Sequence, residues 1–362
     1  NRGHIWISTL FAELDAHNFL RDMPHILNHP LDIPAAWRGS EWEADRSWLY
    51  SLHPSVVDEL QADLDGVRES GRQMFQIEPR HFPLPSFAAM RKQLLDDLEG
   101  GRGFVLIRGL PVDGCSDYDI ATLFWGLGTH LGTPEPQDVA GNLFHHVRDT
   151  GRDLSQGDIR KYQTNQDIPF HNDGSDIFLL LCVRNAKSGG SSRLISSTAV
   201  FNEMLNRRPD LARVLQQPFY FDARGQQYEG EPRAQCVPIY NYHEHRLSTL
   251  HKRFYIELAQ RFPEVPPLSK RQIAALDLFD EICGEPGMCF EFDMQPGDIL
   301  AASNYDVLHC RTSFEDHDDP ARRRHMMRLW LSIPNGRPLP PVFARTREFR
   351  HSYARRTSVQ VS

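Results

Sequence analysis

The segment FHNDGSDIFLLLCVR, residues 170–184, joins a polar motif to a long apolar run. The run Ile177–Val183 is typical of a strand that is buried on both faces. His171 and Asp173 come just before it, two positions apart. In a strand, residues i and i+2 project from the same face, so both side chains could bind one ion while Asn172 points away. The motif is therefore either half of a metal site or a polar turn at the start of a buried strand.

The composition is that of an ordinary globular protein, because 40% of the 362 residues are hydrophobic and 24% are charged. A net charge of −8 offers no basic field for nucleic acid or an anionic membrane. No apolar stretch is long enough to span a bilayer, and no secretory signal is visible. The six cysteines show no CxxC pair and no short disulfide spacing. We expect a cytoplasmic protein in a reducing compartment, without zinc fingers, disulfides, nucleic-acid partners or membrane partners.

The order of elements predicts the fold class. Early helices are followed by many short strands, one helical insertion and further strands, which indicates an α+β domain built on an antiparallel sandwich or barrel. No Gly-rich loop joins a strand to a helix in a βαβ unit, and this excludes Rossmann and P-loop folds. We expect an N-terminal extension with helices over residues 1–100, the main domain over 101–340 and a C-terminal tail over 341–362.

Periodicity and turn residues predict the main elements. Helices are expected at 116–132, 198–215 and 268–284, and strands at 103–111, 177–183, 289–294, 299–303 and 326–333. Residues 138–168 form a polar stretch, and a loop of that length is usually functional or disordered. This stretch and residues 222–235 are each either a lid over the site or a plain surface loop.

A metal site needs a third ligand, and the best candidate is His309 in NYDVLHCRTSFED. Two histidines and one carboxylate on one side of a metal leave positions open. That arrangement suits non-haem Fe(II) oxygenases, and zinc hydrolases use a similar set. The three ligands alone leave both possibilities open.

The segment RRRHMMRLWLSI, residues 322–333, adds a second observation. Read as a strand, it has one wholly apolar face that includes Met327 and Leu329, while Arg324 and Arg328 lie on the other face. Two arginines on a buried strand are costly without anionic partners. The partners are either a bound carboxylate, which suits a guanidinium, or Asp and Glu side chains of the chain itself.

In this order, HxD at 171–173, a distal His309 and RxxxRLW at 324–330 resemble the taurine dioxygenase and clavaminate synthase-like branch of the Fe(II)/2-oxoglutarate-dependent oxygenases. The resemblance covers roughly residues 100–335. It implies a double-stranded β-helix, or jelly-roll, core with flanking helices and iron at one open end. It also implies Fe(II) as the cofactor, 2-oxoglutarate and O₂ as co-substrates, and release of succinate and CO₂.

The resemblance implies roles for six residues of this sequence. The metal and catalytic set would be His171, Asp173 and His309, and the co-substrate set would be Ser192, Arg324 and Arg328. Arg324 would pair with the distal carboxylate of 2-oxoglutarate. Ser192 replaces the threonine that is common at its position, and it retains a hydroxyl group. Arg328 matches an arginine that lies near the substrate's anionic group in some members and braces the co-substrate in others.

The expected activity is hydroxylation or desaturation of a small molecule. Halogenating relatives replace the carboxylate ligand with Gly or Ala, whereas this chain keeps Asp173. With Arg328 as an anchor, we expect a small anionic or amino-acid-derived metabolite. Two alternatives stay open: a zinc-dependent hydrolase on a cupin-like jelly roll, and a non-catalytic metal- or ligand-binding protein on the same fold. The sequence does not specify the oligomeric state.

Overall fold

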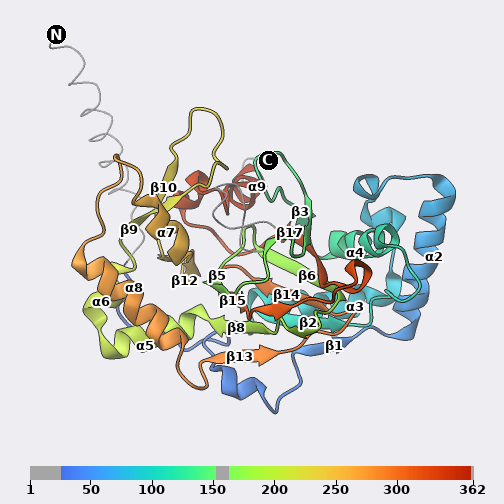
Figure 1. Cartoon of the computed structure of the whole chain (residues 1–362), viewed down its shortest axis with the longest axis horizontal. Coiled ribbons are helices and arrows are strands. Elements are labelled where there is room, and N and C mark those ends of the chain that lie inside the picture. Colours follow the sequence, from blue (N-terminus) through green and yellow to red (C-terminus); the bar gives the residue numbers. More distant parts are fainter. Residues whose placement is uncertain (1–25, 152–162, 360–362) are drawn as a thin grey trace, which may run out of the picture.

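The computed structural model describes residues 26–151 and 163–359, and two mainly antiparallel sheets form its centre (Figure 1). The larger sheet has the order β1-β2-β14-β6-β17-β3, with β4 also paired to β17. Its strands are β1 (Leu49–Ser51), β2 (Phe104–Arg108), β3 (Thr133–Pro134), β4 (Phe144–Val147), β6 (Ile177–Arg184), β14 (Ile299–Ser303) and β17 (His325–Ser332). The smaller sheet has the order β13-β8-β15-β5 and comprises β5 (Ile168–His171), β8 (Ser192–Ser196), β13 (Cys289–Phe292) and β15 (Val307–Arg311).

The two sheets pack face to face around a buried apolar cluster. Phe178 and Trp330 contribute to it from the larger sheet, and Leu194 and Val307 contribute from the smaller one. Burial of side chains from two inner sheet faces is what holds such a sandwich together. The mixed α+β class expected from the sequence is confirmed.

Helices cover the outer face of the larger sheet. They are α2 (Pro54–Ser70), α3 (Ala88–Glu99) and α4 (Asp117–Leu131), and Ser116 caps the start of α4, because its hydroxyl accepts from the Asp119 amide. Met327 and Leu329 of β17 belong to the cluster under these helices, whereas Met326 and Trp330 face the smaller sheet. The two faces predicted for this strand are therefore confirmed within β17, whereas Arg324, which was predicted on the same strand as Arg328, lies just before it.

A helical insertion covers the smaller sheet. It contains α5 (Ser197–Arg207), α6 (Pro209–Val214) and α8 (Lys270–Cys283), which lie at the opposite end of the molecule from α2 in Figure 1. The single helix predicted at 198–215 is two helices, because Pro209 lacks an amide hydrogen and starts a new one. The hairpin of β9 (Pro218–Asp222) and β10 (Ala234–Pro238), the hairpin of β11 (Tyr240–His243) and β12 (Arg246–Thr249), and α7 (Arg253–Ala259) complete this region.

Both ends of the described chain pack on the sheets. β1 pairs in parallel with β2, and Trp37 and Trp48 are buried in the cluster between the sheets. At the other end, α9 (Arg350–Val359) lies against the start of β6, where Arg356 forms an ion pair with the buried Asp176. β7 (Ser188–Gly189) and β16 (Phe314–Glu315) form a short ribbon, and all six cysteines are free. Within the described residues, none of the helices has both the length and the apolar character needed to cross a membrane.

Candidate metal centre

The HxD motif lies at the junction between β5 and β6. His171 is the last residue of β5, and Asp173 follows in the connection, so the expectation that both occupy one strand was wrong. The connection is held by Asn172, whose side chain donates to the Asn304 carbonyl (2.6 Å) and accepts from the His251 amide (2.6 Å). The Asn304 side chain in turn accepts from the Asp173 amide (3.1 Å). The conformation of the HxD motif is therefore fixed by hydrogen bonds from the Asn172 and Asn304 side chains to backbone groups, and not by the alternation of residues along a strand.

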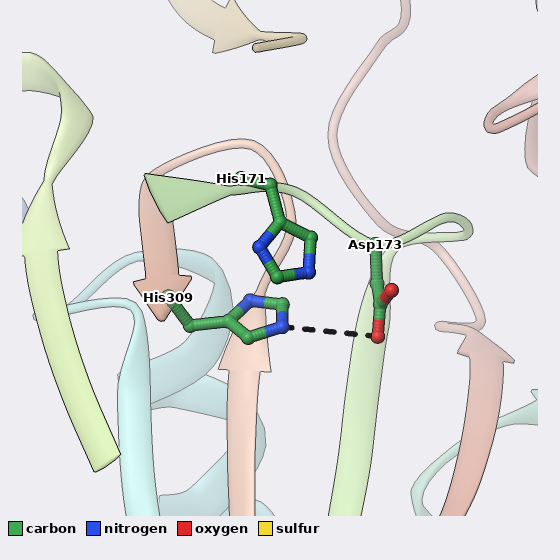
Figure 2. Close-up of side chains that lie close together, drawn as sticks. All are labelled: His171, Asp173 and His309. Carbon is green, nitrogen blue, oxygen red and sulfur yellow. Dashed lines mark ion pairs between the residues drawn. The ribbon is translucent and has the colours of Figure 1, made fainter. Parts of the chain in front are cut away.

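Figure 2 shows His171, Asp173 and His309 converging on one point. His309 lies in β15 and is the register partner of His171 in β5. The two rings have centroids 4.2 Å apart, and His309 Nε2 lies 3.9 Å from Asp173 Oδ2. One ligand atom from each of the three residues can be chosen so that all lie within 4.8 Å of one another. These three side chains are thus close enough to share an ion.

The protonation states of the triad suit a metal. Burial lowers the pKa values of His171 and His309, which favours neutral imidazoles. Burial alone would raise the pKa of Asp173, but the nearby positive charge of Arg328 holds it well below its usual range. His171 Nδ1 donates to the Pro169 carbonyl (2.9 Å), which leaves Nε2 with its lone pair. Neutral histidines and an ionised carboxylate are the forms that bind metals.

Two cavities meet at the triad, because His171, Asp173 and Arg328 border both. The inner cavity lies between the sheets, and its lining includes Phe178, Ser192, Leu194, His309, Arg311 and Arg324. The outer cavity is lined on its other sides by Arg224, Lys252, Arg253, Phe254, Tyr255, Trp330 and Arg347, among others. The predicted co-substrate residues Ser192 and Arg324 therefore lie together on one side of the triad.

Arg324 provides the test of whether a carboxylate fits the inner cavity. It is only 4% exposed, and among the described residues its Nη1 has no hydrogen-bond partner and its guanidinium forms no ion pair. Burial lowers its pKa to about 10. An uncompensated buried charge costs on the order of 3–5 kcal/mol. A carboxylate bound in the cavity would remove that cost, so the residues fit the distal end of 2-oxoglutarate.

Arg328 differs from Arg324 in having protein partners. Its Nη1 lies 3.0 Å from both carboxylate oxygens of Asp173, and its Nε donates to Gln137 Oε1 (2.8 Å). Its guanidinium also lies 5.2 Å from the centre of the Trp330 ring. The sequence left two possible partners for these arginines, a bound carboxylate or an acidic side chain of the chain itself. For Arg328, the partner is an acidic side chain, that of Asp173. The partner is itself a candidate metal ligand.

Sequence reasoning missed most of the outer cavity. Lys252 and Arg347 stand in no recognisable motif. Both lie close to Glu348, which accepts from Lys252 Nζ at 2.7 Å and lies 3.9 Å from Arg347. The expected lid at 222–235 is the turn of the β9–β10 hairpin, and it contributes Arg224 to the cavity. In the stretch 138–168, β4 pairs with β17 and Val147 lines the inner cavity. Residues 152–162 of that stretch lie outside the described residues.

Comparison with known proteins adds independent information. The sequence profile of the "Taurine catabolism dioxygenase TauD, TfdA family" matches residues 67–330. FR-33289 synthase of Streptomyces rubellomurinus is 30% identical over 330 residues, covering 88% of this chain and 95% of that protein. The taurine hydroxylase-like protein SAT17 of Stachybotrys chartarum is 25% identical over 337 residues, covering 90% of this chain and 85% of that protein.

Solved structures share the fold. An asparagine oxygenase in complex with Fe(II), 3-hydroxyasparagine and succinate superposes with a TM-score of 0.59 at 17% identity, covering 78% of this chain and 93% of that chain. The non-haem iron oxygenase OrfP with Fe and α-ketoglutaric acid has the same TM-score at 15% identity and the same coverage. Together with the profile match, these comparisons mean that the chain belongs to the TauD/TfdA family and is an Fe(II)/2-oxoglutarate-dependent dioxygenase.

Proposed function

We propose that this dioxygenase hydroxylates or desaturates a small anionic or amino-acid-derived metabolite and releases succinate and CO₂. The two sheets would form the double-stranded β-helix of the family. His171, Asp173 and His309 would hold Fe(II). The observation that carries this proposal is the meeting of two cavities at the triad. One contains the buried Arg324, which forms no ion pair within residues 26–151 and 163–359, and the other is rich in cations.

The inner cavity suits 2-oxoglutarate. Arg324 would bind the distal carboxylate through charge-assisted hydrogen bonds, and Ser192, which is 7% exposed on the same lining, would donate a further one. When bound, Fe(II) and 2-oxoglutarate supply the oxidative chemistry, in which O₂ activation is coupled to decarboxylation of the co-substrate. The apolar walls at Phe178 and Leu194 would exclude water from this side.

The outer cavity suits the primary substrate. Its lining contains five cationic side chains but one carboxylate, Asp173, which the metal would engage. Such a lining favours an anionic molecule, and Phe254, Tyr255 and Trp330 offer apolar surface for its carbon skeleton. Arg328, at the boundary, is positioned to orient Asp173 and to contact the substrate. Retention of Asp173 favours hydroxylation or desaturation over halogenation.

The test is the visible charge-transfer band that anaerobic Fe(II) plus 2-oxoglutarate gives in such sites. We expect a weak band in the wild-type protein and none in His171→Ala. We also expect succinate release in air that increases when an accepted acid is added. Exposed His29 gives the matched control, because His29→Ala should keep the band.

The rival functions give different results. Absence of the band together with tight zinc binding and hydrolysis would favour the zinc enzyme. A band without succinate production in air, whatever acid is offered, would favour a binding protein. Either result would overturn the proposed reaction.

A further inference from the structure

The cations of the outer cavity form a connected arc. Arg328 and Arg347 both bind Gln137, the first through the side-chain oxygen (2.8 Å) and the second by donating from Nη2 to the carbonyl (3.1 Å). Arg347 and Lys252 both face Glu348, at 3.9 and 2.7 Å. The three cations therefore form a row in space, in which Gln137 lies between Arg328 and Arg347 and Glu348 lies between Arg347 and Lys252.

The charges of this arc do not balance. The carboxylates on it are Asp173, which pairs with Arg328, and Glu348, which is shared by Lys252 and Arg347. Asp173 is the candidate metal ligand, so its charge would be engaged by iron. Glu348 lies closer to Lys252. Burial raises the pKa of Glu348, but the positive charges of Lys252 and Arg347 and the hydrogen bonds from Gln235 and Lys252 together lower it to about 2. Arg347 therefore has the weakest compensation of the three.

Arg347 is held in place by its backbone as well. Its amide donates to Gln235 Oε1 of β10 (2.7 Å), and the neighbouring Glu348 carbonyl accepts from the Ser175 amide (2.7 Å), two residues after Asp173. The segment that carries it lies beyond residues 67–330, the part matched by the family profile. A side chain that is 12% exposed on such a framework is pre-organised for a ligand.

We propose that Arg347, together with Lys252, binds a second anionic group of the substrate, a carboxylate, phosphoryl or sulfonyl group. The first anionic group would lie at Arg328. Arg224 lies over the rings of Phe254 and Tyr255, 5.7 and 5.9 Å from their centres, and adds positive potential to the same cavity. This assignment rests on the proposed function, because it gives the outer cavity to the substrate.

The experiment uses sulfate as the probe on the anaerobic protein loaded with Fe(II) and 2-oxoglutarate, by calorimetric titration at constant ionic strength. We expect at least one sulfate per chain, with one bound at Arg347 and Lys252, and we expect Arg347→Met to weaken the binding of that sulfate by about tenfold or more, as for a lost charge-assisted hydrogen bond. Arg347→Lys should retain most of the binding. Arg345→Met is the matched control, because Arg345 is exposed and two residues away, and it should bind like the wild type.

A second measurement compares acids that differ by one anionic group: aspartate with asparagine, glutamate with glutamine, and O-phosphoserine with serine. We expect succinate release to favour the charged member of any accepted pair, and Arg347→Met to reduce that preference. No sulfate binding by the wild type, or equal binding by Arg347→Met, would overturn the inference. The charge-transfer band is recorded in the same samples. If the band is present but sulfate binding does not depend on Arg347, the inference about Arg347 is wrong while the proposed function still stands.

Discussion

At the scale of single residues, Arg324, which lies just before β17, and Arg328, which lies within it, have different tasks. Arg324 is buried without an anionic partner among the described residues, whereas Arg328 pairs with Asp173. The first is therefore poised to bind an external carboxylate. The second already compensates a charge of the site.

Replacing Arg324 with Met should weaken 2-oxoglutarate binding by roughly 10- to 100-fold, because a hydrogen bond to a charged group contributes about 1.5–3 kcal/mol. Stability should stay equal or rise, since an uncompensated buried charge is replaced by an apolar side chain. The dependence of the charge-transfer band on 2-oxoglutarate and a thermal melt measure both effects. Exposed Arg322→Met is the control. Unchanged 2-oxoglutarate affinity would remove Arg324 from the co-substrate site.

At the scale of elements, the β5–β6 connection is confined between β17 and the C-terminal segment. A Cβ atom on Gly174 would lie 2.6 Å from Trp330 Cζ3 and 3.0 Å from the Glu348 carbonyl oxygen. The residue after Asp173 must therefore be small, and the packing of three distant segments positions the metal ligand.

Gly174→Ala should destabilise the protein by about 1–3 kcal/mol, the usual range for overpacking, and should also weaken metal binding. Urea unfolding and Fe(II) titration provide the two measurements. Gly66→Ala is the control, because Gly66 lies in α2 with nothing within 4 Å of an added Cβ. The helical substitution should be neutral or stabilising. Equal stability of the two variants would argue against the close packing described here.

The junction of β4 and β17 contains a buried histidine beside Arg324. His325 Nδ1 accepts from Arg184 Nη2 (3.0 Å) and lies 3.4 Å from Asp117 Oδ2, while its Nε2 donates to His146 Nδ1 (2.8 Å). Burial lowers its pKa from 6.5 to about 4, with His146 and Arg184 adding to the effect and Asp117 opposing it. His325 is therefore neutral in the folded protein at neutral pH.

Between about pH 6.5 and pH 4, His325 is largely protonated in the unfolded chain but largely neutral in the folded protein. Because the unfolded state binds more protons in this window, stability should fall as the pH is lowered through it. His325→Gln should make that fall shallower, as measured by urea unfolding between pH 7 and 4.5. His29→Gln, at an exposed position, should follow the wild type. An identical slope in His325→Gln would refute the assignment.

At the scale of the whole molecule, site and stability are linked, because the ligands compensate charges that folding buries. Fe(II) and 2-oxoglutarate at about 100 times their dissociation constants should each stabilise the folded state by about 2.7 kcal/mol. An anaerobic thermal melt should therefore show two increments in Tm. At the same ligand concentration, Arg324→Met should reduce the 2-oxoglutarate increment to about 0.4–1.4 kcal/mol and keep that of the metal. His171→Ala should lose both increments. If neither variant changed the Tm increment from Fe(II) or that from 2-oxoglutarate, the proposed link between ligand binding and stability would be contradicted.

The sequence alone determined the residue types of the candidate site and which faces of individual strands are buried. The alternation in β17 and the continuous apolar run of β6 follow from local spacing, which is why the two faces of β17 were predicted. The sequence predicted His309 as a third ligand, whereas the pairing of His309 with His171 across β15 and β5 was not predicted.

Only the tertiary structure decided how the site is closed and charged. Asn172 meets Asn304 across 132 positions, and Lys252 meets Glu348 across 96, so neither contact has a local signal. The same is true of Arg347, which reaches the outer cavity because the C-terminal segment docks beside the HxD connection. Periodicity reports which face of an element is buried, whereas a binding site depends on which buried faces meet, and only packing determines that.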